Sequence, residues 1–192
     1  MNLPPLILAS VSPRRKELLS QLGVEFSVVP CKAEELHDEQ LTAWEISQLN
    51  ACRKARAVAK HFPDALVLGA DTLVYLGATL FGKPASRAAA VQMLEQLQGK
   101  THQVVTGLCL LHLRGHRQKV FADVTDVTFH PLTRKQIERY LAEINPLDKA
   151  GAYAIQDNGE WIVENISGSF SNVVGLPVRR LREELSLWVA AR

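Results

Sequence analysis

Short apolar runs alternate with amphipathic stretches along this chain, and the two kinds of pattern predict strands and helices. The run Leu6-Ile7-Leu8-Ala9 predicts a short buried strand. A helix is expected next, because Ser12 is a good N-cap, Pro13 suits the first turn and Gly23 favours a stop. The apolar stripe of this helix consists of Leu18, Leu19 and Leu22.

The same patterns assign the rest of the chain. Apolar runs rich in branched and aromatic residues predict strands at 24–30, 65–77, 102–113, 119–132, 150–156 and 160–166. Helical periodicity and capping residues predict helices at 43–61, 87–99, 134–144 and 178–191. The stripe of the helix at 43–61 runs through Ile46, Leu49 or Asn50, Ala57 and Val58. The turns RGHRQ and Asp157-Asn158-Gly159 predict hairpins, so we expect an α/β fold with antiparallel strands.

Composition places the chain among ordinary globular proteins. Of its 192 residues, 47% are hydrophobic and 22% are charged, and the formal net charge is +2. This balance favours neither nucleic acid nor a membrane surface as a partner. The chain has no apolar run of a membrane span and no signal-peptide pattern at its start. Its widely spaced cysteines, Cys31, Cys52 and Cys109, predict unpaired thiols, so we expect a cytoplasmic protein.

Arg14 and Arg15 lie where the first helix begins, at the positive end of its dipole. Exposed cations there are unfavourable by about 0.3–1 kcal/mol each. A bound anion would make the two arginines favourable at this position, because backbone N–H groups and guanidinium groups would converge on the anion. The alternative is a pair of solvated arginines on a surface helix.

Asp71 interrupts the apolar strand predicted at 65–77. A buried carboxylate is costly unless it has a cation, hydrogen-bond donors or a metal. Asp71 is therefore a candidate general base or metal ligand, the alternative being a residue that caps a turn at the strand end.

Other charged residues carry weaker signals. Lys54 lies on the helix at 43–61, Lys83 in a Gly-Lys-Pro turn, and Glu34 and Glu35 in an acidic run, and each is equally explained as solvated. The chain has no glycine-rich phosphate loop and no histidine spacing typical of a metal site. Basic residues at a helix N-terminus, with carboxylates to hold Mg²⁺, suit phosphoryl transfer. The residues alone lead to a hypothesis of metal-assisted phosphate chemistry.

Five motifs in order resemble those of the Maf family, the septum-formation-inhibitor-like nucleotide pyrophosphatases. They are LASVSPRRKELL, LGADTLV, GKP, DKAGAYAIQ and NVVGLP, and the resemblance covers about residues 6–185. It implies a Maf/inosine-triphosphatase-like α/β fold, with a mixed sheet and two lobes around a central cleft, in a single domain over 1–192. It also implies hydrolysis of a nucleoside triphosphate to the monophosphate and pyrophosphate.

The resemblance also implies roles for single residues. Asp71 matches the catalytic carboxylate, which activates water and binds a divalent cation, Mg²⁺ or Mn²⁺, and Glu35 matches a position that shares this metal. Basic residues at four matching positions would hold the triphosphate: Arg14, Arg15, Lys54 and Lys83.

Three further positions distinguish subgroups of this family. Arg14, Thr72 and Gln156 match the subgroup that acts on dTTP and UTP, whereas Trp, Gln and Glu there mark a subgroup that acts on 7-methyl-GTP. A glutamine offers the donor and the acceptor that a uracil or thymine edge requires. The chain departs from the family pattern at Asn50, Asp157 and Phe170. Because Asp157 follows Gln156 directly, CTP or modified pyrimidine nucleotides stay open as further substrates.

Several alternatives to the hypothesis of a dTTP/UTP pyrophosphatase stay open. The chain could be a 7-methyl-GTP pyrophosphatase, a nucleotide-binding regulator without turnover, or a phosphatase that releases single phosphates. Its cellular role could be removal of modified nucleotides or control linked to cell division. A nucleoside triphosphate is the expected partner, nucleic acid and membranes are not expected, and a homodimer is left open.

Overall fold

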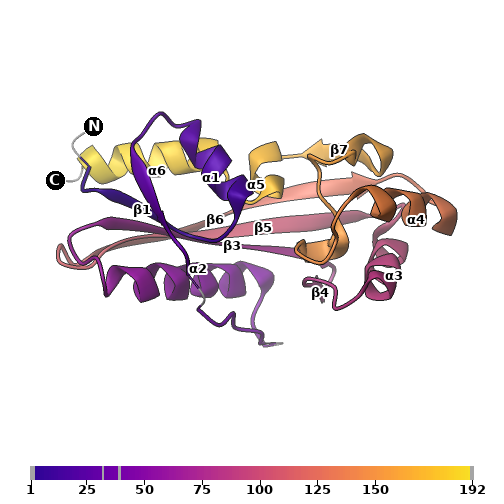
Figure 1. The fold of residues 1–192 in the computed structure, drawn as a ribbon, viewed down its shortest axis with the longest axis horizontal. Helices are drawn as coiled ribbons and strands as arrows, with labels where there is room; N and C mark the ends of the chain where they lie inside the picture. The colour runs from indigo at the N-terminus through magenta and orange to yellow at the C-terminus, as the bar shows by residue number, and fades with distance from the viewer. Residues whose placement is uncertain (1–2, 32, 39, 191–192) are drawn as a thin grey trace. The chain divides into compact units, whose positions relative to one another are not determined.

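The computed structural model describes residues 3–31, 33–38 and 40–190 and has a mixed α/β fold (Figure 1). The strands are β1 (Leu6–Ala9), β2 (Phe26–Val29), β3 (Leu66–Leu76), β4 (Thr79–Phe81), β5 (Thr101–His112), β6 (Arg117–Phe129) and β7 (Val163–Ser167). The α-helices are α1 (Pro13–Ser20), α2 (Ala43–Ala59), α3 (Arg87–Leu97), α4 (Arg134–Glu143), α5 (Phe170–Val174) and α6 (Val178–Ala190). Two 3₁₀ helices are η1 (Ala150–Ala152) and η2 (Gly159–Trp161). Within the described ranges, no helix combines the length and the apolarity that crossing a bilayer requires.

The strands of the described residues form one sheet in the order β2-β1-β3-β5-β6-β7, with β4 paired to β3. β1 is parallel to both β2 and β3, whereas β4 is antiparallel to β3 and β7 is antiparallel to β6. The predicted α/β class with a mixed sheet is therefore confirmed.

The chain divides into two compact units. The first comprises the described residues within 1–71, 106–123 and 175–192, and the second comprises 72–105 and 124–174. A single domain over 1–192 stays a prediction.

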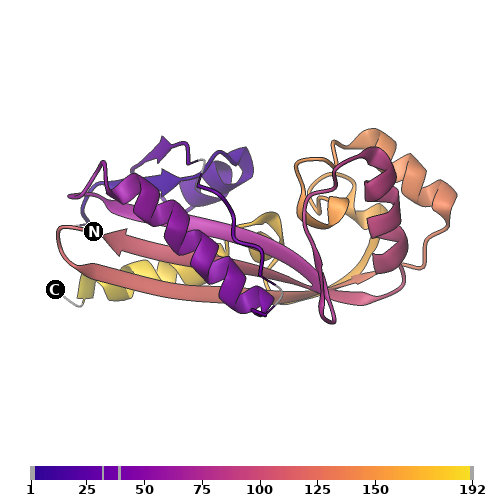
Figure 2. The same ribbon diagram turned by 90° about the horizontal axis from the view of Figure 1, so that it is seen from below.

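In the first unit, α2 lies along one face of the sheet and α6 along the opposite face (Figures 1 and 2). Two glycines let α2 approach its face closely. A Cβ at Gly69 of β3 would overlap the carbonyl oxygen of Ala51, and a Cβ at Gly107 of β5 would overlap the backbone of Ser47. Such overlap excludes any larger residue without a shift of backbone. The first half of α2 is thus held directly against β3 and β5.

The inward face of α2 differs in part from the predicted stripe. Asn50 is buried and Leu49 is exposed, which resolves the choice between them. Ala57 is also exposed, so its assignment to the stripe was wrong, and Lys54 is buried instead. A polar residue can occupy an inward position when its polar atoms find partners there, as Asn50 and Lys54 do.

The predicted hairpin between 150–156 and 160–166 is wrong. Gly151 and Ala152 have positive φ angles of 69° and 64°, which lie outside the extended region of a regular strand. The chain instead forms η1, a turn and η2, and only β7 is a strand, paired with β6. Asn158 has a left-handed φ of 54°, so the turn was located correctly although its flanks were not.

In the second unit, α3 packs against α4, and a buried histidine lies in the apolar core beside them. Nε2 of His102 and the hydroxyl of Tyr153 are joined by a hydrogen bond of 2.9 Å, and the His102 ring meets Phe129 edge-on. Burial lowers the pKa of His102 to about 4. His102 is therefore neutral at pH 7.

This histidine should make the protein less stable in mild acid. Between its unfolded pKa of about 6.5 and its folded pKa, the unfolded chain binds more protons, so the free energy of unfolding falls as pH falls. From pH 7 to pH 5 the wild-type chain should lose about 2 kcal/mol more than His102→Phe. Urea unfolding of both chains at the two pH values measures this difference. Equal losses would show that His102 does not titrate as its burial requires.

Candidate active site

Asp71 and the start of α1 lie at the same edge of the sheet in the first unit. β1 and β3 run parallel, with Ala9 opposite Gly69, so Asp71 extends past the carboxyl end of β1. The chain leaves β1 at this end and enters α1 at Pro13. Ligands of open parallel sheets usually bind beyond the carboxyl ends of the strands.

The side chain of Asp71 points toward α2. Successive side chains of a strand alternate between faces, so Asp71 shares a face with Val67 and Gly69, which contact α2. Asn50 and Lys54 are four residues apart on α2 and therefore occupy one face of the helix. Alternation along β3 and the helical repeat of α2 together make these three side chains meet.

Four residues form a network that we call the Asp71 cluster: Glu35, Asn50, Lys54 and Asp71. Nζ of Lys54 lies 2.6 Å from Oδ1 of Asp71 and 2.8 Å from Oε1 of Glu35. Nδ2 of Asn50 donates a hydrogen bond of 3.1 Å to Oδ2 of Asp71. Asp71 is 3% exposed, so its charge requires such partners. Both of its carboxylate oxygens have one.

The two arginines are positioned at the N-terminus of α1. The hydroxyl of Ser12 caps the helix by accepting from the backbone N–H of Arg15. Nε of Arg15 donates to the carbonyl of Gly175 at 2.9 Å. Burial lowers the pKa of the Arg15 guanidinium, whereas the negative charges of Asp71 and Glu35 raise it. The neighbouring positive charge of Arg14 also lowers the pKa of Arg15.

Glu35 and Asp71 are candidate ligands for a divalent cation that the phosphates of a substrate would also hold. Glu35 and Asp71 contact the same Lys54 ammonium at 2.8 and 2.6 Å, so the two carboxylates face one cation. Among the described residues, no three His, Cys, Asp or Glu side chains gather to hold a metal. Mg²⁺ prefers oxygen ligands and is commonly held by one or two carboxylates together with substrate phosphates and water. The residues fit such a cation.

The remaining predicted residues belong to the second unit. Thr72 follows Asp71 directly on β3. Lys83 is exposed in the turn after β4, where the carbonyl of Gly82 accepts from the backbone N–H of Gly151 at 3.1 Å. Gln156 is exposed at the turn before η2. The structure thus joins Asp71, Lys54 and Glu35 directly, whereas Lys83 and Gln156 belong to the other unit.

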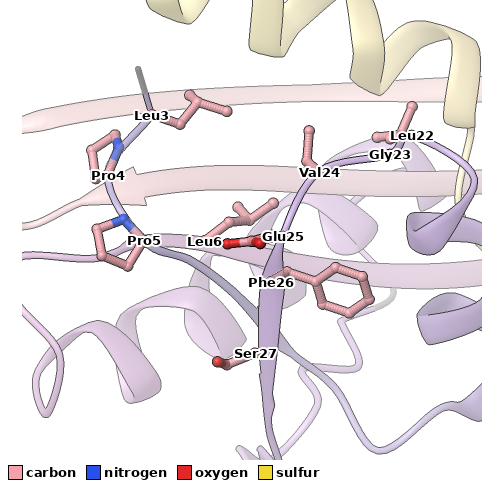
Figure 3. A pocket seen from close by; sticks show the side chains of 10 residues that line it. All are labelled: Leu3, Pro4, Pro5, Leu6, Leu22, Gly23, Val24, Glu25, Phe26 and Ser27. Atoms are coloured by element: carbon pink, nitrogen blue, oxygen red, sulfur yellow. The ribbon is translucent and has the colours of Figure 1, made fainter. Parts of the chain in front are cut away.

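A cavity of about 920 Å³ in the first unit lies elsewhere (Figure 3). Residues 3–6 and 22–27 line it, including Leu6 and Phe26, the first residues of β1 and β2. It is therefore at the amino ends of these strands, away from the carboxyl ends where α1 begins. It contains no residue of the Asp71 cluster.

Sequence reasoning did not assign Asn50 or Gly175 to this site. Asn50 lies one helical turn from Ile46, which makes it a candidate for the inward face of α2, but Leu49 fits the apolar stripe equally well. Gly175 acts through its backbone carbonyl, and the signal for it is its place in the motif NVVGLP, where its φ of 122° favours glycine.

A family model described as Maf-like protein matches residues 5–188. The dTTP/UTP pyrophosphatase of Desulforamulus reducens is 45% identical over 184 residues, which are 96% of each chain. The dTTP/UTP pyrophosphatase of Phocaeicola vulgatus is 48% identical over 186 residues and covers 94% of each chain.

Among solved structures, the Ham1 protein of Staphylococcus aureus is similar, with a TM-score of 0.53 at 15% identity. It covers 95% of this chain and 98% of that chain. A likeness at this level of identity supports the fold alone. The match over residues 5–188 and the two relatives above 40% identity go further, and the chain belongs to the Maf family.

Proposed function

We propose that the chain hydrolyses dTTP and UTP to the monophosphate and pyrophosphate. The observation that carries this proposal is near-full-length identity of 45–48% to dTTP/UTP pyrophosphatases. The Asp71 cluster supports it, because it places a buried carboxylate and a lysine beside two arginines at a helix N-terminus.

Each charged group has a role in this reaction. A water molecule attacks the α phosphorus and forms a new P–O bond, and Asp71 accepts the proton that this water loses. The bond from the α phosphorus to the oxygen that bridges the α and β phosphates breaks, and pyrophosphate leaves. Arg14, Arg15 and Lys54 bind phosphate oxygens and offset the charge that develops on them. Lys83, held in its turn by the Gly82–Gly151 hydrogen bond, is proposed as a fourth phosphate-binding group. Lys54 would exchange part of its contact with Asp71 and Glu35 for the substrate.

A divalent cation would be held by Asp71 and Glu35 together with substrate phosphates. When bound, Mg²⁺ or Mn²⁺ supplies charge neutralisation and orients the phosphates. We expect EDTA to abolish turnover of dTTP and excess Mg²⁺ or Mn²⁺ to restore it, measured by pyrophosphate release. Full activity after exhaustive chelation and dialysis would contradict the proposed role of the two carboxylates in holding a metal.

Arg14, Thr72 and Gln156 are proposed to select the nucleobase of the substrate. A site that hydrogen-bonds one base edge leaves its own groups unpaired with a different base, at a cost of about 1–3 kcal/mol for each group. We expect kcat/KM to be highest for dTTP and UTP and lowest for purine triphosphates, with CTP between them.

Exchange of these three residues should move the preference. The triple variant Arg14→Trp, Thr72→Gln, Gln156→Glu should gain relative kcat/KM for 7-methyl-GTP and lose it for dTTP and UTP. The single variant Gln118→Glu changes an exposed glutamine on β6 and serves as the matched control. A wild-type chain that prefers 7-methyl-GTP would show that the assignment from the three residues is wrong.

A further inference from the structure

We propose that Asn50 is a positioning residue that holds the general base Asp71 and the Glu35 segment in one arrangement. This inference rests on the proposed function. Asn50 is 1% exposed on α2 and has hydrogen bonds to both parts of the cluster that it joins.

The amide group of Asn50 pairs with one whole peptide unit. Its Oδ1 accepts from the backbone N–H of Leu36 at 2.7 Å, and its Nδ2 donates to the carbonyl of Leu36 at 3.2 Å. The second hydrogen of Nδ2 is directed to Oδ2 of Asp71 at 3.1 Å. Only an oxygen can accept the hydrogen bond from the Leu36 N–H, so this bond fixes which end of the Asn50 amide faces Leu36. The nitrogen is thereby turned toward Asp71.

The segment that Asn50 holds has no regular secondary structure of its own. Residues 33–38 form neither helix nor strand, so their geometry depends on contacts with α2. Besides Asn50, Arg53 donates to the carbonyl of Glu34 at 3.2 Å, and Lys54 contacts Glu35. Arg53 is exposed, so water can compete for its hydrogen bond to Glu34, whereas Asn50 is buried and its hydrogen bonds are shielded from water. Asn50 is therefore a buried connection between the Leu36 peptide unit and Asp71, next to the direct bridge that Lys54 makes from Glu35 to Asp71.

A positioning role predicts a specific pattern of kinetic effects. Asn50→Leu keeps the number of side-chain heavy atoms and the branch at Cγ, and it removes all three hydrogen bonds. It should lower kcat for dTTP by about 10- to 100-fold, the range expected when a charged group loses a hydrogen bond, and leave KM within about threefold. Asn50→Asp keeps an acceptor for Leu36 but loses the donor to Asp71, so it should lower kcat at least as much.

Ser47→Ala is the matched control. Ser47 is buried on the same helix, but its hydroxyl donates only to the carbonyl of Trp44 within α2. This variant should keep the wild-type kcat even where its Tm falls. A kcat loss in Ser47→Ala equal to that in Asn50→Leu would overturn the proposal in favour of general destabilisation.

Two measurements separate this inference from the proposed function. In an Asp71→Asn background, Asn50→Leu should lower the residual activity no further, because its effect acts through Asp71. Hydrogen exchange should become faster in residues 33–38 of Asn50→Leu and stay unchanged in Ser47→Ala, whatever the protein hydrolyses. An active wild-type chain with full kcat in Asn50→Leu overturns the positioning role. Unchanged exchange overturns the structural connection, and an inactive wild-type chain overturns the proposed function and, with it, the catalytic part of the role.

Discussion

Replacing Asp71 with Asn is expected to lower kcat for dTTP and UTP by about 10²–10⁴-fold, the usual contribution of a general base. The amide keeps the shape of the side chain and retains an oxygen that can accept from Lys54 or Asn50, so the fold should persist. Initial rates of pyrophosphate release measure the loss. Circular dichroism and Tm verify the fold.

Asp64→Asn is the matched control for this variant. Asp64 is also an aspartate paired with a cation, Arg114, but its side chain is 70% exposed at the surface. Its replacement should leave kcat within experimental error of the wild type. Asp71→Asn with more than about a tenth of wild-type kcat would remove Asp71 as the general base, because loss of such a base costs at least about 10²-fold.

Replacing Lys54 with Met should destabilise the protein by about 3–5 kcal/mol, since it leaves the buried Asp71 carboxylate without its cation. Lys54 is itself 9% exposed, so its charge interacts through little water. For a chain of this size the change corresponds to a fall in Tm of roughly 6–20 °C. Turnover should also be lost, because Lys54 is proposed to bind the triphosphate. Thermal unfolding and dTTP hydrolysis measure the two effects.

The exposed ion pair of Arg134 and Glu138 is the control for the buried pair of Lys54 and Asp71. Arg134 pairs with Glu138 at 2.9 Å and is 69% exposed, so Arg134→Met should cost less than about 1 kcal/mol. Adding Asp71→Asn to Lys54→Met removes the uncompensated charge and should recover part of the lost stability. If Lys54→Met and Arg134→Met shift Tm equally, the lysine does not support a buried carboxylate.

The sequence predicted most helices because their starts are encoded locally. Ser12, Ser86 and Thr133 all act as N-caps through their hydroxyl groups, as their positions before amphipathic stretches indicate. The short helix α5 was missed, since five residues carry too little periodicity to detect. The apolar run at 150–156 is typical of a strand, but Gly151 has a left-handed backbone and its N–H bonds to the carbonyl of Gly82, which is distant in sequence.

The candidate site was predictable only in part for a related reason. Asp71 could be recognised as a carboxylate that needs partners, because it lies within an apolar strand. Which partners it finds depends on the packing of α2 against β3, and the close approach at Gly69 determines that packing. Asn50 could not be chosen over Leu49 from the pattern alone, because both lie near the same helical stripe.

The identity of the products tests the central claim most directly. dTTP and UTP are incubated separately with the wild-type protein and Mg²⁺, and the phosphorus-containing products are quantified by ³¹P NMR. We expect one pyrophosphate for each monophosphate formed, from the first time point onward. Asp71→Asn should release pyrophosphate about 10²–10⁴-fold more slowly. Orthophosphate with a nucleoside diphosphate, or binding of both nucleotides without any product, would contradict the account.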